Sequence, residues 1–456
     1  MKHFGHDITG ATHSVVDFFQ SLSRYPSALA GLAIILILII VSIGTMIKIP
    51  YSRVIPLWRG DNQAWIANPI EAQPAWTNLF RKDKLPETIQ VSSQDNPALK
   101  EIGVDASGNK TLSMTLAFDY EYDTLPQDVL VKFDTITKNL QPFVSMRWVT
   151  PDGRIIQLNH FAVTQDMLDF FSQDYYLTTK FYDTTPVEAL FGKPGGAPGE
   201  ALPGHYELRM NGFLFEPDSN LDTRLVVYGR VYGLAGTDGQ RKDLLLVLLW
   251  GTAVALSFGI LAAVGTTLCS VTLAAMGAWF GGWVDGLIHR ISEVNMVLPI
   301  LPTSLMIFYL YSKSFWVLLG VTVGLSIFGN SIKNYRAMFM QIKTHPYVET
   351  AVSYGSSNWR VILKYLLPRV QGVLIPQLII LVPSYVFFEA TLSFLGVSDP
   401  LLPTLGKQLL AALNSGMYGR PVYLLLEPIL MLVLISIGFP LVGFALERLY
   451  HEKLGV

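Results

Sequence analysis

The sequence predicts an all-α polytopic membrane bundle that carries an inserted β-rich domain. Apolar residues make up 51% of the 456 positions. Only 15% of the residues are charged, compared with about a quarter in soluble domains. The charges crowd into residues 50–245, and long apolar runs lie on both sides of that region. The chain therefore combines membrane-spanning helices with one water-soluble insert.

The first apolar run, residues 28–47, contains no charged side chain. About 20 helical residues cross a hydrocarbon core of about 30 Å. No small-residue cleavage pattern follows the run, so we expect a retained anchor. Five more runs follow, at residues 251–279, 292–311, 315–332, 373–395 and 422–446. We therefore expect about six transmembrane helices.

The distribution of lysine and arginine predicts the orientation. Residues 333–369 hold six of these basic side chains against one acid, Glu349. Short basic flanks stay in the cytoplasm, whereas long domains cross regardless of charge. We therefore expect this loop and both termini to lie in the cytoplasm, and the insert and the loop 396–421 to lie outside it.

Alternating apolar residues predict strands in the insert. Residues 111–123 place large apolar side chains on every second position, which is the period of a strand with one buried face. Residues 145–158 contain two such runs around Pro151-Asp152-Gly153, a favourable turn sequence. Residues 206–215 and 223–232 show the same pattern, and the Gly/Pro-rich segment 192–204 predicts a surface loop. We expect a small β-sandwich-like domain with one or two helices.

The predicted organisation has three parts. Residues 1–49 form a cytoplasmic tail and the first transmembrane helix. Residues 50–235 form the extracytoplasmic insert. Residues 236–456 form a core of five transmembrane helices that contains a cytoplasmic loop at 340–370.

Several functions are excluded by composition and missing motifs. A net charge of −2 provides no basic surface for nucleic acid. The single cysteine, Cys269, allows neither an intrachain disulfide nor a thiolate zinc cluster, and we expect it to be a small core residue. His160 and His205 have no partner at metal-ligand spacing. No phosphate-binding loop, nucleophile elbow or zinc-protease motif occurs, so we predict no catalytic residue, no metal, no cofactor and no enzyme activity of the chain itself.

The segment 349–368, ETAVSYGSSNWRVILKYLLP, predicts two short helices joined by a bend. Gly355 can adopt the left-handed conformation that ends the first helix. Ser356 or Ser357 can cap the second, and Pro368 comes where that helix should stop or kink. The segment carries more apolar side chains than a free loop needs, so we expect them to be covered: Ala351, Val352, Tyr354, Val361, Ile362 and Tyr365.

This segment closely resembles the coupling-helix signature of ABC-importer permeases, which reads Glu-Ala-Ala, three residues, Gly, and then a longer spacer that ends in Leu-Pro. Thr350 replaces the first alanine of the signature, and Tyr365 stands where relatives commonly have histidine. In that family the two helices dock into a groove on a separate ATPase subunit. The resemblance therefore implies ATPase coupling by Glu349, Thr350, Ala351, Gly355, Ser357, Leu367 and Pro368.

Further segments resemble the C-type permease of the dipeptide, oligopeptide and nickel permease family in the same order. They are residues 23–36 (SRYPSALAGLAIIL), 236–238 (GTD), 280–285 (FGGWVD) and 389–396 (EATLSFLG). One departure is Arg241-Lys242-Asp243, which lacks the second glycine of the family pattern. A second is the insert, because family members usually have a much shorter loop there.

The resemblance implies a type I ABC importer fold, a place in the bacterial inner (cytoplasmic) membrane and a set of partners. These are a second permease subunit in a heterodimer, two ATP-binding ATPase subunits, an extracellular solute-binding protein and the lipid bilayer. Transport of peptides or similar small solutes would proceed by alternating access. The predicted role of the insert is to guide or stabilise the docked binding protein.

Two other functions remain open. The chain could be a membrane-anchored interaction module whose external domain docks another protein, although an intact coupling signature argues against lost transport. It could also be an ABC efflux subunit, against which the importer spacing in a late inner loop speaks. A basic amphipathic inner loop by itself is also common in polytopic proteins.

Glu389 and Ser393 are candidate gate or cavity residues near the outer end of the fifth run. Acids within membrane helices are costly and usually face a bundle interior or water. The alternative is that Glu389 lies at interface depth and accepts hydrogen bonds from nearby backbone or serine groups.

Overall fold

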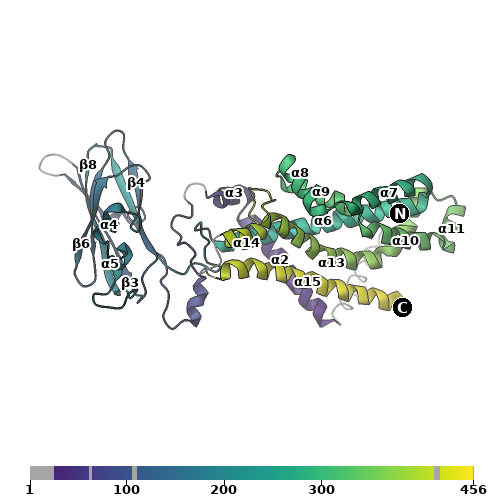
Figure 1. Cartoon of the computed structure of the whole chain (residues 1–456), viewed down its shortest axis with the longest axis horizontal. Coiled ribbons are helices and arrows are strands. Elements are labelled where there is room, and N and C mark those ends of the chain that lie inside the picture. Colours follow the sequence, from purple (N-terminus) through teal and green to yellow (C-terminus); the bar gives the residue numbers. More distant parts are fainter. Residues whose placement is uncertain (1–24, 61–63, 105–109, 415–421, 455–456) are drawn as a thin grey trace, which may run out of the picture. The chain divides into compact units, whose positions relative to one another are not determined.

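The computed structural model describes residues 25–60, 64–104, 110–414 and 422–454, and the chain divides into two compact units. One unit, here the helical unit, contains the chain up to Arg59 and from Leu246 onward. The other, here the β unit, is Gly60–Leu245 and holds all the strands (Figure 1). The predicted β-rich domain between helical segments is therefore confirmed.

The β unit is a sandwich of two antiparallel sheets. The first sheet has the order β1-β9-β4-β7 and the second the order β2-β3-β8-β5-β6. The strands are β1 (Ile89–Ser92), β2 (Lys100–Val104), β3 (Lys110–Tyr120), β4 (Asp128–Ile136), β5 (Phe143–Val149), β6 (Ile155–Ala162), β7 (Leu168–Phe170), β8 (Gly204–Leu214) and β9 (Asn220–Tyr228).

One core joins the two sheets. Leu112, Met114 and Leu116 alternate with exposed positions along β3 and point inward, as the sequence predicts. Val129 and Phe133 of β4, in the other sheet, belong to the same buried cluster. Because each sheet buries one face against the other, the sandwich is stable without a disulfide.

The turn at Pro151-Asp152-Gly153 forms as predicted between β5 and β6. Thr150 N donates to Arg154 O over 3.0 Å, and Gly153 has a φ of +85°, which glycine adopts without strain. Two short helices complete the unit, α4 (Tyr175–Lys180) and α5 (Pro186–Phe191). Residues 192–203, between α5 and β8, contain neither helix nor strand, which confirms the predicted loop.

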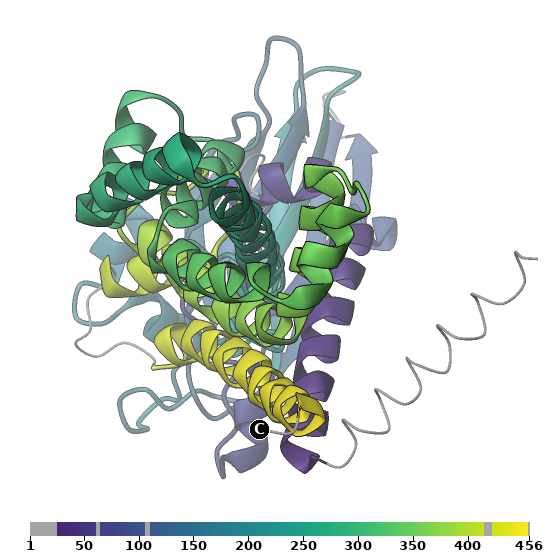
Figure 2. The same cartoon turned by 90° about the vertical axis from the view of Figure 1, so that its right-hand side faces the viewer.

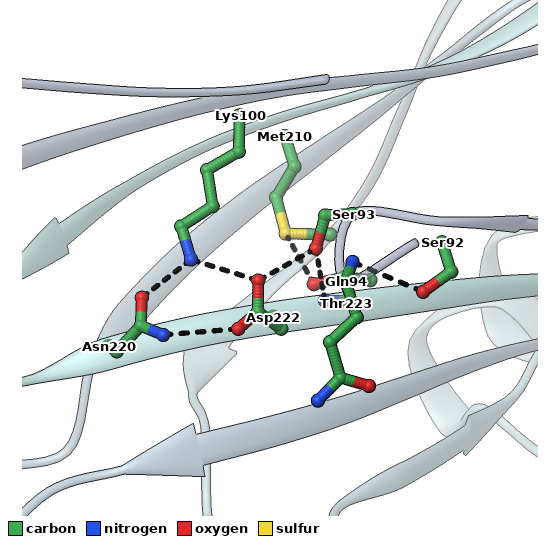
Figure 3. Close-up of polar contacts among 8 residues, drawn as sticks. All are labelled: Ser92, Ser93, Gln94, Lys100, Met210, Asn220, Asp222 and Thr223. Carbon is green, nitrogen blue, oxygen red and sulfur yellow. Dashed lines mark hydrogen bonds and ion pairs between the residues drawn. The ribbon is translucent and has the colours of Figure 1, made fainter. Parts of the chain in front are cut away.

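A polar cluster ties the edge strand β2 of one sheet to β9 of the other (Figure 3). Lys100 of β2 contacts Asn220 and Asp222 of β9, with 2.9 Å between its Nζ and Asp222 Oδ1. Ser93 Oγ donates to the same carboxylate over 3.0 Å and accepts from Thr223 N over 3.0 Å. These groups satisfy one another, so the cluster is a structural link and not an open binding site.

Four segments of the helical unit are long and apolar enough to cross a membrane, and they are Pro26–Lys48 (α2), Leu244–Phe280 (α6), Asn358–Phe394 and Tyr423–Tyr450 within α15 (Tyr423–Leu454). Two bent pairs bring the number to six if each pair is one span. The pairs are α7 (Gly282–Val297) with α8 (Ile300–Leu310), bent by 85°, and α9 (Phe315–Ile327) with α10 (Asn330–Lys343), bent by 46°. The helical bundle is confirmed at this level.

The predicted crossings at 292–311 and 315–332 correspond in the structure to two bent pairs of helices. The first is broken between Val297 and Ile300, where Pro299 lacks a backbone donor and forces Leu298 into an extended conformation. The second bends at Gly329, between α9 and α10. Hydropathy could not show these breaks because the residues on both sides are apolar.

The span Asn358–Phe394 consists of α12 (Asn358–Val361), a short π-helical turn and α13 (Leu367–Phe394). Shorter helices of the helical unit are α3 (Tyr51–Arg59), α11 (Pro346–Ser353) and α14 (Leu405–Asn414). Within this unit, α11 lies at one end and α3 and α14 lie at the other (Figure 1). Cys269 is exposed on α6 and is not the small core residue that its apolar surroundings predict.

Glycines allow α2 and α15 to run side by side (Figure 2). A Cβ atom at Gly31 of α2 would lie 2.7 Å from Gly438 O and 2.8 Å from Leu441 Cβ of α15. Such close backbone approach is the common way for membrane helices to gain van der Waals contact.

Candidate functional site

The candidate site is the knob, defined as residues 346–366, in which α11 turns into α12. The turn is a hydrogen-bonded left-handed cap. Gly355 has a φ of +77°, its N–H donates to Val352 O over 2.9 Å, and Ser356 N donates to Ala351 O over 3.1 Å. These two bonds are the pair of a Schellman motif, and glycine is favoured at its left-handed position. The predicted helix, bend and helix are all present.

The start of α12 differs from the prediction. Ser357 occupies the N-cap position with extended backbone, but its side chain makes no capping hydrogen bond. Its backbone carbonyl accepts from Val361 N over 3.0 Å. Ser357 and the neighbouring bend are therefore held by backbone geometry.

Pro368 does not end the second helix, which rules out the first of the two predicted outcomes, a stop or a kink. A π-helical turn, η4 (Ile362–Leu366), follows α12 and leads directly into α13, whose first turn contains Pro368. Proline lacks an N–H and crowds the carbonyl one turn before it. The wider π turn accommodates both the missing N–H and the bulk of the proline ring. The segment Asn358–Phe394 therefore continues as one 37-residue span.

The inner face of the knob packs within the chain. Val348, Ala351, Val361, Ile362 and Leu366 are all buried. They share one cluster with small residues of α6 and with aromatic residues of α10, namely Ala274, Ala275, Ala278, Tyr335 and Phe339.

The prediction that these six apolar side chains are covered is therefore confirmed for half of them within the chain itself. Ala351, Val361 and Ile362 are covered by the chain's own helices. Val352 and Tyr354 remain exposed, at 47% and 87%. The helical period alone could not separate the two sets because α11 and α12 are short and change direction between them.

The C-terminal end of α6 clamps the knob. Trp279 Nε1 donates to Asn358 Oδ1 of α12 over 3.1 Å. Lys343 Nζ, at the end of α10, donates to Ala278 O and Trp279 O over 3.0 and 2.9 Å. The last carbonyls of a helix have no partner within the helix and carry partial negative charge, so a lysine stabilises them.

An ion pair fixes the neighbouring helices. Arg336 of α10 makes two hydrogen bonds of 2.5 Å to the carboxylate of Asp285, in the first turn of α7. The bidentate geometry fixes orientation as well as distance. Asp285 ends the segment 280–285, which sequence resemblance identified without a role.

The outer face of the knob is exposed and carries acidic, polar and aromatic side chains. Glu349, Thr350 and Ser357 are exposed, as is Trp359 at 52%. Leu367 is half-buried at the start of α13, and Pro368 is exposed. Sequence reasoning missed Trp279, Asn358, Lys343 and Trp359 as parts of this site. Their position beside a recognised motif was the only available signal.

Glu389 and Ser393 lie elsewhere on α13. Glu389 is 21 residues after Pro368, so about 30 Å of helix separates them. Ser393 Oγ donates to Glu389 Oε1 over 2.6 Å, and both residues are buried. The structure therefore supports the expected serine hydrogen bond but places Glu389 in the interior of the helical unit.

A small cavity adjoins Glu389. Its volume is about 10 Å³, and its lining includes Phe258, Phe315, Ser398 and Thr404. Oε2 of Glu389 is buried and has no hydrogen-bond partner among the residues that the structure describes. A volume of this order holds one water molecule, so the space is too small for a transported solute in this conformation.

Comparison with known proteins shows which family the region that contains the knob resembles. Residues 255–454 match the family described as binding-protein-dependent transport system inner membrane component. This part of the chain is therefore similar to that transporter family. We call residues 255–454 the permease domain below.

Relatives of the permease domain are named as permeases of peptidoglycan or dipeptide transport systems. The chain is 29% identical over 181 residues to the peptidoglycan transport system permease protein YejE of Agrobacterium fabrum, covering 40% of this chain and 47% of that one. It is 28% identical over 222 residues to the dipeptide transport system permease protein DppC of Lactococcus lactis, covering 48% and 63%. The chain thus aligns with about half to two thirds of these relatives.

A solved structure shows a weaker likeness. An inward-facing form of the MetNI methionine ABC transporter matches with a TM-score of 0.36 and 16% identity, over 46% of this chain and 97% of that chain.

Proposed function

We propose that the chain is a transmembrane permease subunit of an ATP-binding-cassette importer for peptides or similar small solutes. The observation that carries the proposal is the knob within the permease domain. Its bend holds the importer signature in a Schellman motif, and its inner face is locked to α6 and α10. Its outer face presents Tyr354 and Val352 to a partner.

The geometry suggests how a push on the knob would reach the membrane helices. The knob has a close-packed inner face, and such interiors transmit displacement and do not absorb it. The helix continues from Asn358 through η4 to Phe394. Movement of α12 would therefore move α13 as one lever, whose distal part carries Glu389 and Ser393. We propose these two residues as gate or cavity elements.

The proposed partners follow from the same family. They are a second permease subunit in a heterodimer, two ATPase subunits that bind the knobs, and an extracellular solute-binding protein. We propose a type I importer fold in the bacterial inner membrane, with both termini cytoplasmic. The names of the relatives support peptides as the substrate class.

We propose that the β unit lies outside the cytoplasm and guides or stabilises the docked binding protein. Its place between the first and second spans supports this side of the membrane. Deletion of residues 64–232 should reduce uptake or assembly of the binding protein on the complex. Full uptake together with full assembly in the deletion variant would contradict this role.

The test of the main proposal is co-purification of the tagged chain with its candidate ATPase subunits. Gly355→Asp puts a side chain on the left-handed bend, and Tyr354→Asp puts a charge on the exposed face of the knob. Both variants should lose the ATPase subunits or uncouple ATP hydrolysis from uptake. Tyr175→Asp, at a residue of α4 that is 84% exposed, is the matched control and should retain them.

Other outcomes favour the other functions. If neither the parent chain nor any variant binds an ATPase subunit, a membrane-anchored interaction module becomes the better account. If the complex assembles but moves solute outward in sealed vesicles, the chain is an efflux subunit.

A further inference from the structure

A rigid apolar tip in the β unit has no role in the function proposed above. It is formed by the 3-10 helix η2 (Ala75–Phe80) and by Leu234. Leu79 and Phe80 are each 82% exposed, Leu234 is 68% exposed and Trp76 is 48% exposed. Exposed apolar groups of this size in one place mark a binding surface more often than a free one.

The tip is held in place by hydrogen bonds. Ala75 N donates to Gly233 O over 2.9 Å, and Trp76 Nε1 donates to Leu234 O over 3.0 Å. Asn78 exchanges two hydrogen bonds with the backbone of Leu85, of 2.9 and 3.0 Å. The rings of Trp76 and Phe80 meet edge to face at 6.3 Å. The exposed side chains are therefore presented by an ordered scaffold.

The same scaffold is bonded to the first residue of α6. Leu244 N donates to Gly236 O over 3.1 Å, two residues after Leu234. Thr237 joins the segment 234–237 to the residues that precede η2, because its N–H donates to Ala72 O and its hydroxyl donates to Pro69 O. Two residues span at most about 7 Å. Leu234 thus lies close to the point where α6 begins.

The start of α6 is also where the sequence becomes apolar. No charged residue occurs from Leu244 to Val284, so α6 enters the hydrocarbon region near its N-terminus. The polar layer between water and hydrocarbon is only about 5 to 8 Å thick on each side. Leu234 of the tip is two residues from Gly236, which is bonded to the first residue of α6. The tip is therefore within reach of the membrane surface.

The charges beside the tip complement a phospholipid surface. Arg81, Lys82 and Lys84 follow Phe80 directly, all are exposed, and Asp83 is the one acid among them. Tryptophan and phenylalanine beside lysine and arginine are the combination found at membrane interfaces, where the rings lie at headgroup depth and the cations meet phosphates.

We propose that Trp76, Leu79, Phe80 and Leu234 insert into the headgroup–acyl boundary of the bilayer and anchor the β unit at the membrane surface. Arg81, Lys82 and Lys84 contact lipid phosphates in this arrangement. The anchor limits rotation of the β unit about its two connections to the helices. The inference needs the chain to be a membrane protein but does not depend on transport or on ATPase binding.

Spin labelling tests the proposal in the full-length chain, purified with the subunits that it retains and placed in phosphatidylcholine–phosphatidylglycerol nanodiscs. The native Cys269 is exposed and is first changed to serine. A label at Phe80→Cys should collide more often with oxygen, which concentrates in the bilayer, than with a water-soluble nickel chelate. A label at Tyr175→Cys, whose parent residue is 84% exposed on α4, should show the reverse order.

A second position and a second lipid composition complete the design. Leu234→Cys should behave as Phe80→Cys does, which separates insertion of the tip from a local effect of one label. Removal of phosphatidylglycerol should lower the oxygen preference at both positions if the basic residues contribute. The proposal is overturned if the tip labels are as accessible to the chelate as the Tyr175 label. It is also overturned if they become protected only when a solute-binding protein is added, since the tip is then a protein interface.

Discussion

Lys100 Nζ lies 2.9 Å from Asp222 Oδ1 and so joins the outer strand β2 of one sheet to β9 of the other (Figure 3). The two side chains are only 11% and 18% exposed. Removal of one partner from a largely buried pair leaves an uncompensated charge, which costs about 3 to 5 kcal/mol when burial is complete. The pair is therefore a sensitive point of the sandwich.

Lys100→Met should lower the free energy of unfolding of the β unit by about 2 to 3 kcal/mol, because Asp222 keeps its bonds to Ser93 and Asn220. Lys138→Met is the matched control. Lys138 lies at the same distance, 2.9 Å, from Asp218, but the side chains are 73% and 76% exposed, so the change should cost at most about 1 kcal/mol. Urea unfolding monitored by tryptophan fluorescence measures both, and equal losses would contradict the prediction.

Asp169 should make the β unit less stable as the pH rises. Burial, followed by the neighbouring charge of Asp174, raises the pKa of Asp169 from 3.8 to about 7. The folded state therefore holds a proton that the unfolded state releases between about pH 4 and pH 7, so the free energy of unfolding falls as pH increases through this range. The loss for this one group is about 4 kcal/mol at most.

Asp169→Asn should remove this part of the pH dependence and stabilise the β unit at pH 8. Unfolding curves at intervals between pH 4 and pH 8 give the slope for the parent and for the variant. Asp183→Asn, at an exposed position of the same unit, should leave the slope as it is in the parent. The prediction is wrong if the stability of the parent rises with pH through this range and the slope is unaltered in Asp169→Asn. Another group would then dominate the pH dependence.

The close approach of α2 and α15 predicts different effects for two glycines of one helix. At Gly31 a Cβ atom would lie 2.7 Å from Gly438 O, whereas at Gly44 it would meet nothing within 4 Å. Gly31→Ala should therefore force the helices apart, at a cost of about 1 to 3 kcal/mol. Gly44→Ala should be neutral or slightly stabilising, because alanine favours helix. Thermal unfolding in detergent should show a lower midpoint for Gly31→Ala alone.

The clamp between α6 and the knob predicts a loss of coupling. Trp279→Phe keeps an aromatic ring but removes the 3.1 Å hydrogen bond to Asn358, which is worth about 1 kcal/mol. We expect a several-fold decrease in solute moved per ATP hydrolysed, with ATPase binding retained. Trp316→Phe, at a 68% exposed position of α9, is the control. Unchanged transport stoichiometry in Trp279→Phe would show that the clamp is not needed for coupling.

Some features of the molecule follow from short stretches of sequence. The spans α2, α6, α13 and α15 are predictable because hydropathy over about 20 residues decides membrane insertion. The Gly355 bend is equally local, since one permissive residue decides whether a left-handed cap can form. Along β3, alternation from Leu112 to Tyr120 is local as well, because a strand exposes every second residue to the same face.

Other features depend on contacts between distant residues. Lys343 and Trp279 are 64 positions apart, so no local pattern could show that α10 stabilises the end of α6. The sequence by itself determined where the chain crosses the membrane, where it forms strands and where the knob bends. Only the tertiary structure decided that Ala351 faces inward while Tyr354 faces outward, that Asp169 is buried beside Asp174, and that η2 is bonded to Gly233 and Leu234. The physical reason is that burial and pairing depend on which helices and strands meet, whereas turns, strand period and hydropathy depend on neighbouring residues alone.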